Sequence, residues 1–314
     1  MLAAPHSPVM TAEVVKALDP GEDSILVDAT FGRGGHTRAL LDRLGTNGRI
    51  YAMDRDPEAC AIARDWAQGE HRLRVVHAPF SKLSDELHAA GIAGQVSGIV
   101  LDLGVSSPQL DDPGRGFSFM RDGPLDMRMD PSQGVPVQDW LADVAEEDLI
   151  DVLRRLGEER YARRIARAIV DARNEASLNT TGALSSLVDA CVPTREPGKH
   201  PATRTFQALR LFINQELAEL DAVLPQAIEM LEPGGRLVVI SFHSLEDRRV
   251  KRFFHDVAKA DPFPPDLPIR ADEISPVILR PAKPQRPSAD EVAGNPRARS
   301  AILRWAEKSP GGYA

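Results

Sequence analysis

Cysteine is scarce in this sequence: Cys60 and Cys191 are the only two in 314 residues, and they lie far apart. This scarcity argues against a disulfide framework and a zinc site, and it is typical of a protein from a reducing cytosol. Long hydrophobic runs are also missing, since no apolar stretch reaches the roughly 18 residues that a membrane span needs. Residues 1–11 show no secretory signal. We therefore expect a cytoplasmic protein that uses neither a metal nor a membrane.

An excess of basic residues is absent as well. The chain has 38 Lys and Arg against 46 Asp and Glu, which gives a net charge of −8. Such a balance does not suggest a nucleic-acid-binding protein, although a local basic face is enough to hold phosphates. The length allows one large domain or two modest ones.

The most informative segment is a glycine-rich turn after a short apolar run. Residues 24–27 predict a strand, Asp28 ends it, and a helical pattern begins at His36 after Gly32, Gly34 and Gly35. A second expected strand, residues 49–53, ends at Asp54, about where an acid binds ribose hydroxyls in nucleoside-cofactor sites. The first fifty-odd residues therefore look like half of such a site.

The turn by itself leaves three interpretations open. A dinucleotide site usually has the pattern Gly-x-Gly-x-x-Gly, which these glycines do not follow. An acid such as Asp28 before the turn suits a ligand with an ammonium group better than a pyrophosphate. This favours S-adenosylmethionine, while a nicotinamide cofactor and a structural turn that binds nothing are the alternatives.

Strands and helices alternate up to about residue 106. Further strands are expected at 73–77 and 98–101, and helices at 57–67 and 83–90. This alternation predicts an α/β fold with a doubly wound parallel sheet and helices on both faces.

The middle of the chain predicts helices without strands. Residues 108–134 are rich in glycine and proline and predict a long ordered loop. The helices expected after it are 137–142, 146–156, 158–173 and 181–190. We interpret residues 112–204 as an inserted all-helical domain, with residues 1–111 and 205–314 forming the first domain.

The last third returns to the sheet. Apolar residues from Phe206 to Leu231 recur at three- and four-residue steps and predict one amphipathic helix, kinked at Pro225. Residues 232–235 should end this helix. The segments expected next are a strand at 236–241, an irregular stretch at 261–296 with an edge strand at 276–279 as one interpretation, and a final strand at 300–305.

The strand that ends at Asp102 leads into Ser106, Ser107, Pro108 and Gln109. Ligands of a doubly wound sheet bind at the carboxyl ends of strands, so this loop and the glycine turn should face one crevice. The loop is similar to the Asp/Asn/Ser-Pro-Pro-Tyr loop of methyltransferases that modify exocyclic amino groups. Serine oxygens and the carbonyl before the proline would accept the amine hydrogens and aim its lone pair at the methyl carbon.

Leu110 occupies the place of the aromatic residue that stacks on a flipped base in those enzymes. Phe117, Phe119 or another residue would have to replace it. A plain loop is the alternative interpretation of this segment.

Basic side chains gather in the second half of the chain and predict phosphate contacts, with a solvated helix face as the alternative for the first cluster. These are Arg160, Arg163, Arg164 and Arg167 at helical spacing, Arg204 in a basic run, and Arg248 after His243. His243 lies in Phe242–Asp247, where a hydrolase triad is conceivable, but the Gly-x-Ser-x-Gly elbow is missing. We expect His243 to contact the substrate.

Taken together, these segments resemble the family of ribosomal RNA small subunit methyltransferase H over nearly the whole chain. The residues that carry the resemblance are 6–9, 28–36, 54–56, 101–110, 116–130, 200–207 and 241–248. The resemblance implies a class I, Rossmann-like methyltransferase domain with a helical insertion. It also implies S-adenosylmethionine contacts at Gly34, Gly35, His36, Asp54, Phe80, Asp102 and Gln109.

The resemblance further implies methylation of the N4 amine of a decoding-centre cytosine, cytosine 1402, in 16S rRNA of the small ribosomal subunit. An acidic protein can dock on a folded ribonucleoprotein through a few basic patches. The alternatives are a DNA amino-methyltransferase, a nicotinamide-dependent oxidoreductase and a catalytically silent RNA-binding factor. Either a monomer or a homodimer is compatible with the sequence.

Overall fold

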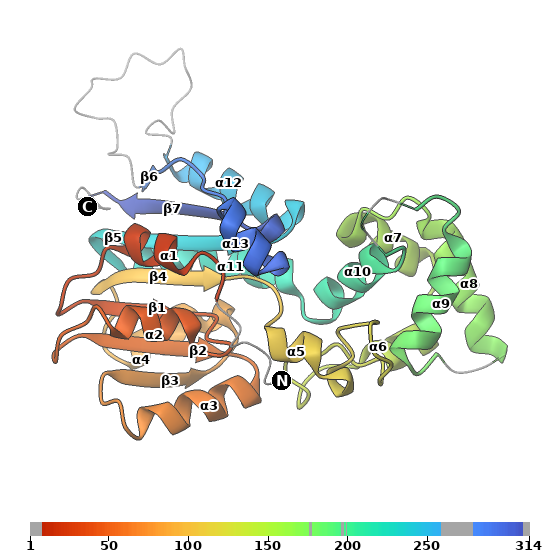
Figure 1. Cartoon of the computed structure of the whole chain (residues 1–314), viewed down its shortest axis with the longest axis horizontal. Helices are drawn as coiled ribbons and strands as arrows, with labels where there is room; N and C mark the ends of the chain where they lie inside the picture. The colour runs from red at the N-terminus through yellow and green to blue at the C-terminus, as the bar shows by residue number, and fades with distance from the viewer. Residues whose placement is uncertain (1–7, 176–177, 196–197, 199, 259–278, 310–314) are drawn as a thin grey trace, which may run out of the picture. The chain divides into compact units, whose positions relative to one another are not determined.

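A computed structural model describes residues 8–175, 178–195, 198, 200–258 and 279–309. The chain divides into two compact units, which are Met1–Gly104 with Ala218–Ala314, and Val105–Leu217 (Figure 1). The insertion expected at 112–204 falls inside the second unit. His6, Ser7 and residues 261–278 of the sequence-based expectations lie outside the described residues.

The first unit is built on a seven-stranded sheet in the order β3-β2-β1-β4-β5-β7-β6. Strands β1 to β5 are parallel, whereas β7 runs antiparallel to both β5 and β6. The strands are β1 Ile25–Asp28, β2 Arg49–Asp54, β3 Leu73–His77, β4 Val96–Asp102, β5 Leu231–Ser241, β6 Leu279–Pro281 and β7 Ile302–Lys308. The predicted fold class, a doubly wound α/β sheet, is confirmed.

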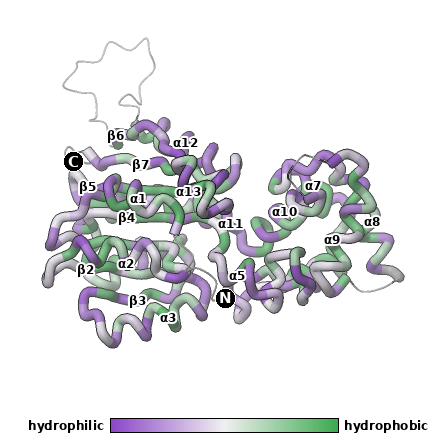
Figure 2. Tube along the Cα trace, in the orientation of Figure 1, coloured by the Kyte–Doolittle hydropathy of each residue, from purple (hydrophilic) through white to green (hydrophobic). Residues whose placement is uncertain are grey.

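Helices cover both faces of this sheet. They are α1 Thr11–Leu18, α2 Gly35–Leu41, α3 Pro57–Ala67, α4 Leu83–Ala89, α11 Glu216–Met230, α12 Ser244–Ala258 and α13 Ala289–Gly294, with the 3₁₀ turns η1 Phe80–Lys82 and η3 Pro296–Ser300. Along β4, Ile99 and Leu101 pack against α4, α11 and α12, whereas Val100 packs against α1, α2 and α3. A strand buried on both faces reads as a continuous hydrophobic run, which Figure 2 shows along the central strands.

Two expectations for residues 232–296 are wrong in detail. Strand β5 already begins at Leu231, and its pairing with β4 shifts register between Val96 and Gly98, so residues 232–235 lie inside the strand. Within the stretch expected to be irregular, α13 forms because the Ser288 hydroxyl caps it by accepting the Glu291 N–H at 3.1 Å. Glu291 in turn accepts the Met10 N–H at 2.6 Å, a contact that no local pattern announces.

The second unit is a helical body with its own hydrophobic core. Its helices are α5 Ser107–Asp111, α6 Val137–Asp143, α7 Glu146–Gly157, α8 Ala162–Glu175, α9 Thr181–Cys191 and α10 Thr203–Ile213, with the 3₁₀ turn η2 Pro113–Arg115. The loop expected at 108–134 is therefore partly helical. Its remainder is a folded scaffold, since Leu125 and Met127 are fully buried and Arg115 donates to the Met129 carbonyl at 2.8 Å.

The single helix expected between Phe206 and Leu231 is two helices, α10 and α11. Asn214 lies at the break and is buried. Its amide donates to the Met127 carbonyl at 2.8 Å and accepts the Met129 N–H at 2.7 Å. Gln215 follows with a φ of 52°, which ends the helix. Pro225 lies inside α11 and does not mark the break.

Helix α8 begins later than expected, at Ala162 rather than at residue 158. Glu158 closes α7 in a left-handed conformation with a φ of 49°. Glu159 is buried, and its Oε1 accepts the Tyr161 N–H at 2.9 Å. Arg160 therefore lies in a turn before α8. Of the arginines expected on one helix face, only Arg163, Arg164 and Arg167 belong to α8.

Candidate functional site

Three acidic side chains lie where central strands of the first unit end. Asp28, Asp54 and Asp102 are the last residues of β1, β2 and β4. Strand β1 is hydrogen bonded to both β2 and β4, so the direction of chain progression reverses beside it. Such a switch point is where open α/β sheets bind ligands.

Asp28 is fully buried, with an exposed fraction of 0%. Its carboxylate accepts the Thr37 hydroxyl at 2.7 Å and the Thr30 N–H at 3.2 Å. Burial raises the pKa of Asp28, and the charge of His36 and these hydrogen bonds do not reverse the shift. The carboxylate of Asp28 is thus bonded to the glycine-rich turn at Thr30 and to Thr37 in α2.

His36, in the first turn of α2, lies beside Asp102. Its Nε2 is 3.4 Å from Oδ2 of Asp102. Burial disfavours the charged imidazole, but Asp102 and Asp28 outweigh burial and raise the pKa of His36. Within the described residues, neither ring nitrogen of His36 nor Oδ1 of Asp102 makes a hydrogen bond. Because buried polar atoms are normally satisfied, this pair fits a ligand that carries amino and carboxylate groups.

Asp54 is half-buried at the end of β2. Its Oδ2 accepts the Gly32 N–H at 2.8 Å, and its Oδ1 accepts the Asp56 N–H at 2.9 Å. Burial raises the pKa of Asp54 to about 6, despite these two hydrogen bonds. Asp54, the acid expected from the strand spacing, is therefore held against the turn by these two hydrogen bonds.

Gly34 is the residue before α2 and has a φ of +72°. A Cβ there would lie 2.6 Å from the rings of Phe31 and Trp66, and one on Gly35 would lie 2.6 Å from Pro8. The glycines thus allow the turn to pack against the protein itself.

Phe80 opens the turn η1 after β3 and is half-buried against the core. The first unit therefore offers an acid, an aromatic ring and a buried polar pair, which is the donor set that the ribose, the adenine and the methionine end of S-adenosylmethionine require.

The segment expected to hold the target amine belongs to the second unit and forms the start of α5. Ser106 is its N-cap, and Oε1 of Gln109 accepts the Ser106 N–H at 2.9 Å. Gln109 is buried, while Ser106, Ser107 and Pro108 are half-buried. Since carbonyls in a helix point toward its C-terminus, the Ser107 carbonyl is aligned with the axis of α5, which leaves the hydroxyls as candidate acceptors. The Ser106 hydroxyl already accepts the Gln109 backbone N–H in the capping box.

Two phenylalanines are the expected replacements for the aromatic residue missing at Leu110. Phe117 is buried in the core of the second unit. Phe119 is half-buried, and its ring lies 4.6 Å from that of His200 and 4.8 Å from that of Phe206, centroid to centroid. Of the two, Phe119 has the more accessible ring.

His243 follows β5, and its Nε2 lies 3.0 Å from Oε1 of Glu246. The other Glu246 oxygen accepts the Phe242 N–H at 2.9 Å, and Asp247 pairs with Arg304 at 2.7 Å. Both acids therefore secure the start of α12, which is no arrangement for a hydrolase triad. Arg248 is exposed on α12.

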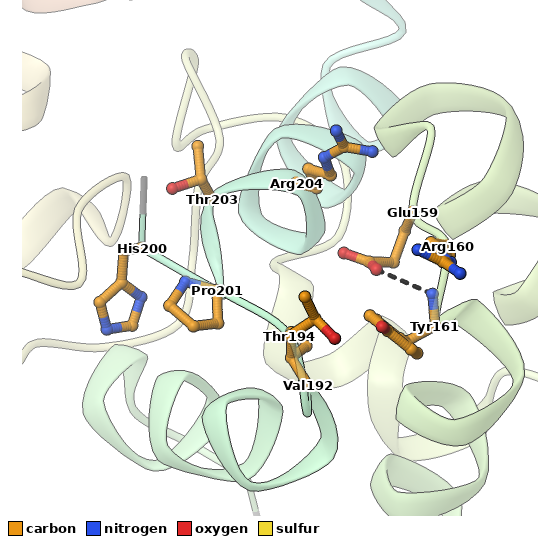
Figure 3. A pocket seen from close by; sticks show the side chains of 9 residues that line it. All are labelled: Glu159, Arg160, Tyr161, Val192, Thr194, His200, Pro201, Thr203 and Arg204. Atoms are coloured by element: carbon orange, nitrogen blue, oxygen red, sulfur yellow. Dashed lines mark hydrogen bonds between the residues drawn. The ribbon is translucent and has the colours of Figure 1, made fainter. Parts of the chain in front are cut away.

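The second unit contains a cavity of about 280 Å³ (Figure 3). Its lining combines the polar or charged side chains of Glu159, Arg160, Tyr161, Thr194, His200, Thr203 and Arg204 with the apolar ones of Val192 and Pro201. The structure thus brings together Arg160 and Arg204, two of the expected substrate contacts, whereas Arg163 and Arg164 are exposed on α8. Glu159 and Tyr161 were not expected as site residues. The sequence shows an acid and an aromatic among arginines, but only the fold places both in a cavity.

Across the ranges that the structure describes, no three His, Cys, Asp or Glu side chains gather in a way that could hold a metal ion. In the same ranges, no helix has the length and apolar character needed to cross a membrane.

Comparisons with known proteins agree over nearly the full length. The model of the MraW methylase family matches residues 3–309. Ribosomal RNA small subunit methyltransferase H of Aromatoleum aromaticum is 54% identical over 99% of each chain, and that of Azoarcus sp. is 55% identical over 96% of each. A crystal structure of an rRNA methylase from Streptococcus thermophilus aligns with a TM-score of 0.42 at 11% identity, over 95% of this chain and 93% of that one.

Replacing Gly34 by alanine should destabilise the fold more than replacing Gly91. Both residues have a φ of +72°, so each alanine carries the same left-handed strain, about 1–2 kcal/mol. A Cβ at Gly34 also collides with two rings, whereas one at Gly91 meets nothing within 4 Å. Chemical denaturation should show a loss for Gly34→Ala that exceeds the control by at least about 1 kcal/mol. Equal losses would mean that the turn is not packed in this way.

Lowering the pH through about 6 should weaken the binding of S-adenosylmethionine. The raised pKa of Asp54 means that its carboxylate is charged above about pH 6 and protonated below it. Ribose hydroxyls donate more strongly to the charged form, so the Kd should rise as the pH falls, by up to about tenfold per pH unit.

Calorimetry of the wild type and of Asp54→Asn checks this assignment. The variant lacks the charged carboxylate that would accept the ribose hydroxyls, so it should bind S-adenosylmethionine weakly. Because it cannot titrate at this position, it should also lose the step near pH 6 that belongs to Asp54. A wild-type affinity that is flat across this range, or the same step in both proteins, would contradict the assigned role.

Proposed function

The chain belongs to the MraW methylase family, and on that premise we propose that it methylates the N4 amine of a decoding-centre cytosine in 16S rRNA. The observation that carries the proposal is the 54–55% identity to relatives named ribosomal RNA small subunit methyltransferase H, over 96–99% of the chain. The methyl donor is S-adenosylmethionine, and the substrate is the small ribosomal subunit in the cytoplasm.

The donor supplies an electrophilic methyl group on a positively charged sulfur. In the first unit, Asp54 would hold the ribose hydroxyls and Phe80 would contact the adenine. Residues 34–36 together with Asp102 would hold the methionine end, because that end can satisfy the buried polar atoms of His36 and Asp102.

The target amine is a poor nucleophile, since its lone pair is delocalised into the cytosine ring. Acceptors aimed at its hydrogens turn this lone pair toward the methyl carbon, and in-line positioning does the rest. The hydroxyls of Ser106 and Ser107 are the proposed acceptors, and Pro108 leaves no competing N–H at the start of α5. Ser106 follows Asp102 by four residues, so chain connectivity keeps their Cα atoms within about 15 Å.

Gln109 would act by fixing this turn through its bond to the Ser106 N–H. The bound donor would supply the methyl group for the new carbon–nitrogen bond and would keep the electrons of the carbon–sulfur bond on its sulfur. The methylated amine then loses a proton to water, so no strong base is needed.

Docking on the subunit would use exposed cations of both units, which contact phosphates without reading the sequence. The proposed contacts are Arg160, Arg163, Arg164, Arg204 and Arg248, together with His243. This distribution explains how a chain with a net charge of −8 can bind an RNA particle.

Transfer of a labelled methyl group to small subunits, naked 16S rRNA and duplex DNA tests the proposal. We expect label on subunits from cells that lack this protein, at a cytosine that mass spectrometry maps to the decoding centre as N4-methylated. Label on DNA alone would assign a DNA methyltransferase. Subunit binding without label would assign a silent RNA-binding factor, and thermal stabilisation by NAD instead of the methyl donor would assign an oxidoreductase.

A further inference from the structure

The cavity of the second unit combines three kinds of group that recognise an unpaired nucleotide. Tyr161 supplies a ring, Glu159 supplies a carboxylate, and Arg160 and Arg204 supply two guanidinium groups. Single-stranded RNA is bound by stacking on aromatic rings, by hydrogen bonds to base edges and by cations at the phosphates. The volume of the cavity, about 280 Å³, is near the lower end of the range for ligand pockets, about 300 Å³.

Glu159 is the least expected of these groups, because its side chain is only 6% exposed. Its Oε1 accepts the Tyr161 N–H at 2.9 Å, and Figure 3 shows the carboxylate directed into the cavity. A buried carboxylate is costly unless donors reach it. An exocyclic amino group of a base is such a donor, and Glu or Asp is its usual acceptor in nucleic-acid recognition.

The two cations that line the cavity come from two different elements. Arg204, in the first turn of α10, donates to the Glu158 carbonyl at 2.6 Å, which fixes its position. The guanidinium of Arg160 lies 5.8 Å from the centroid of the Tyr161 ring. Both arginines line the cavity, so a phosphate attached to a bound base would have two guanidinium groups as partners.

His200 extends the polar side of the cavity. Its Nδ1 accepts the Ala202 N–H at 3.2 Å, which assigns the proton of the neutral ring to Nε2 and makes that nitrogen a donor. Thr203 begins α10, whose N-cap Ala202 offers no side-chain hydrogen bond to the helix end.

We propose that this cavity binds one unpaired RNA nucleotide whose base carries an exocyclic amino group, as a neighbour of the methylated cytosine. The base lies against Tyr161 and donates to Glu159, and the phosphate meets Arg160 and Arg204. A phosphorylated protein segment would use the arginines but would leave the ring and the buried carboxylate without a role. The identity of the RNA in this inference rests on the proposed function. The chemistry of the cavity does not depend on it.

The test measures the binding of short fluorescent oligocytidylate and oligouridylate to the full chain. Uracil presents a carbonyl where cytosine presents an amino group, so the wild type should prefer oligocytidylate by at least about fivefold. Glu159→Gln keeps the acceptor for the Tyr161 N–H but tolerates a carbonyl, and it should bring this ratio close to one. A ratio that is unchanged in this variant would leave Glu159 with a purely structural role and overturn the inference.

Further variants separate stacking from charge. Tyr161→Ala should weaken both oligonucleotides at least about fivefold, whereas Tyr161→Phe should not. Arg160→Gln should reduce the slope of log K against log salt by about 0.7. The matched control is Arg155→Gln, an exposed arginine paired with Asp151 at 2.9 Å, which should change neither quantity. Thermal unfolding confirms that each variant folds.

Methyl transfer to small subunits by the same proteins keeps the two proposals distinguishable. If the wild type methylates subunits but the cavity variants bind RNA as it does, the cavity inference fails and the proposed function stands. If the variants lose RNA binding as described and the wild type methylates nothing, the function fails and the cavity stands as an RNA site.

Discussion

The burial of charge at the carboxyl ends of β1 and β4 is the constraint on which the first unit depends. Asp28 is removed from water beneath the glycine-rich turn, and His36 and Asp102 lie against each other beside it. Buried charges are tolerated where they are paired and hydrogen bonded, and here the partners of Asp28 are the turn itself and Thr37. The same arrangement leaves polar atoms of His36 and Asp102 without hydrogen bonds among the described residues. A polar ligand at the switch point of the sheet can supply these bonds.

In the second unit, a long segment with little regular structure has to be fixed in place by burial and hydrogen bonds. Leu125 and Met127 are buried as deeply as any helical residue, and Asn214 ties this segment to the end of α10 by hydrogen bonds in both directions. The glycine- and aspartate-rich string around them is therefore a structural scaffold. On this scaffold the beginning of α10 and the turn before α8 present the groups that line the cavity of the second unit. The candidate site at the sheet and the cavity of the helical unit are therefore supported by separate hydrophobic cores.

Sequence patterns predicted the sheet well and the helical unit less well, for physical reasons. Strands β1 to β4 lie within two residues of the expected ranges, because a strand buried on both faces is an apolar run bounded by turn residues. The break at Asn214 escaped prediction because its hydrogen bonds to Met127 and Met129, distant in sequence, decide it. The late start of α8 and the helix α13 involve local hydrogen bonds, at Glu159 and at Ser288, which a pattern of apolar residues does not register. The same division holds for the candidate site: Asp54 follows from strand spacing, whereas the burial of Asp28 and the cavity around Glu159 follow from tertiary packing alone.

A crystal structure of this chain soaked with S-adenosylmethionine tests the central claim most directly. The account predicts the donor at the ends of β1, β2 and β4, with its ribose hydroxyls hydrogen bonded to Asp54 and its amino acid end meeting His36 and Asp102. Donor bound elsewhere on the molecule, or a switch point plugged by the protein's own side chains, would contradict the account.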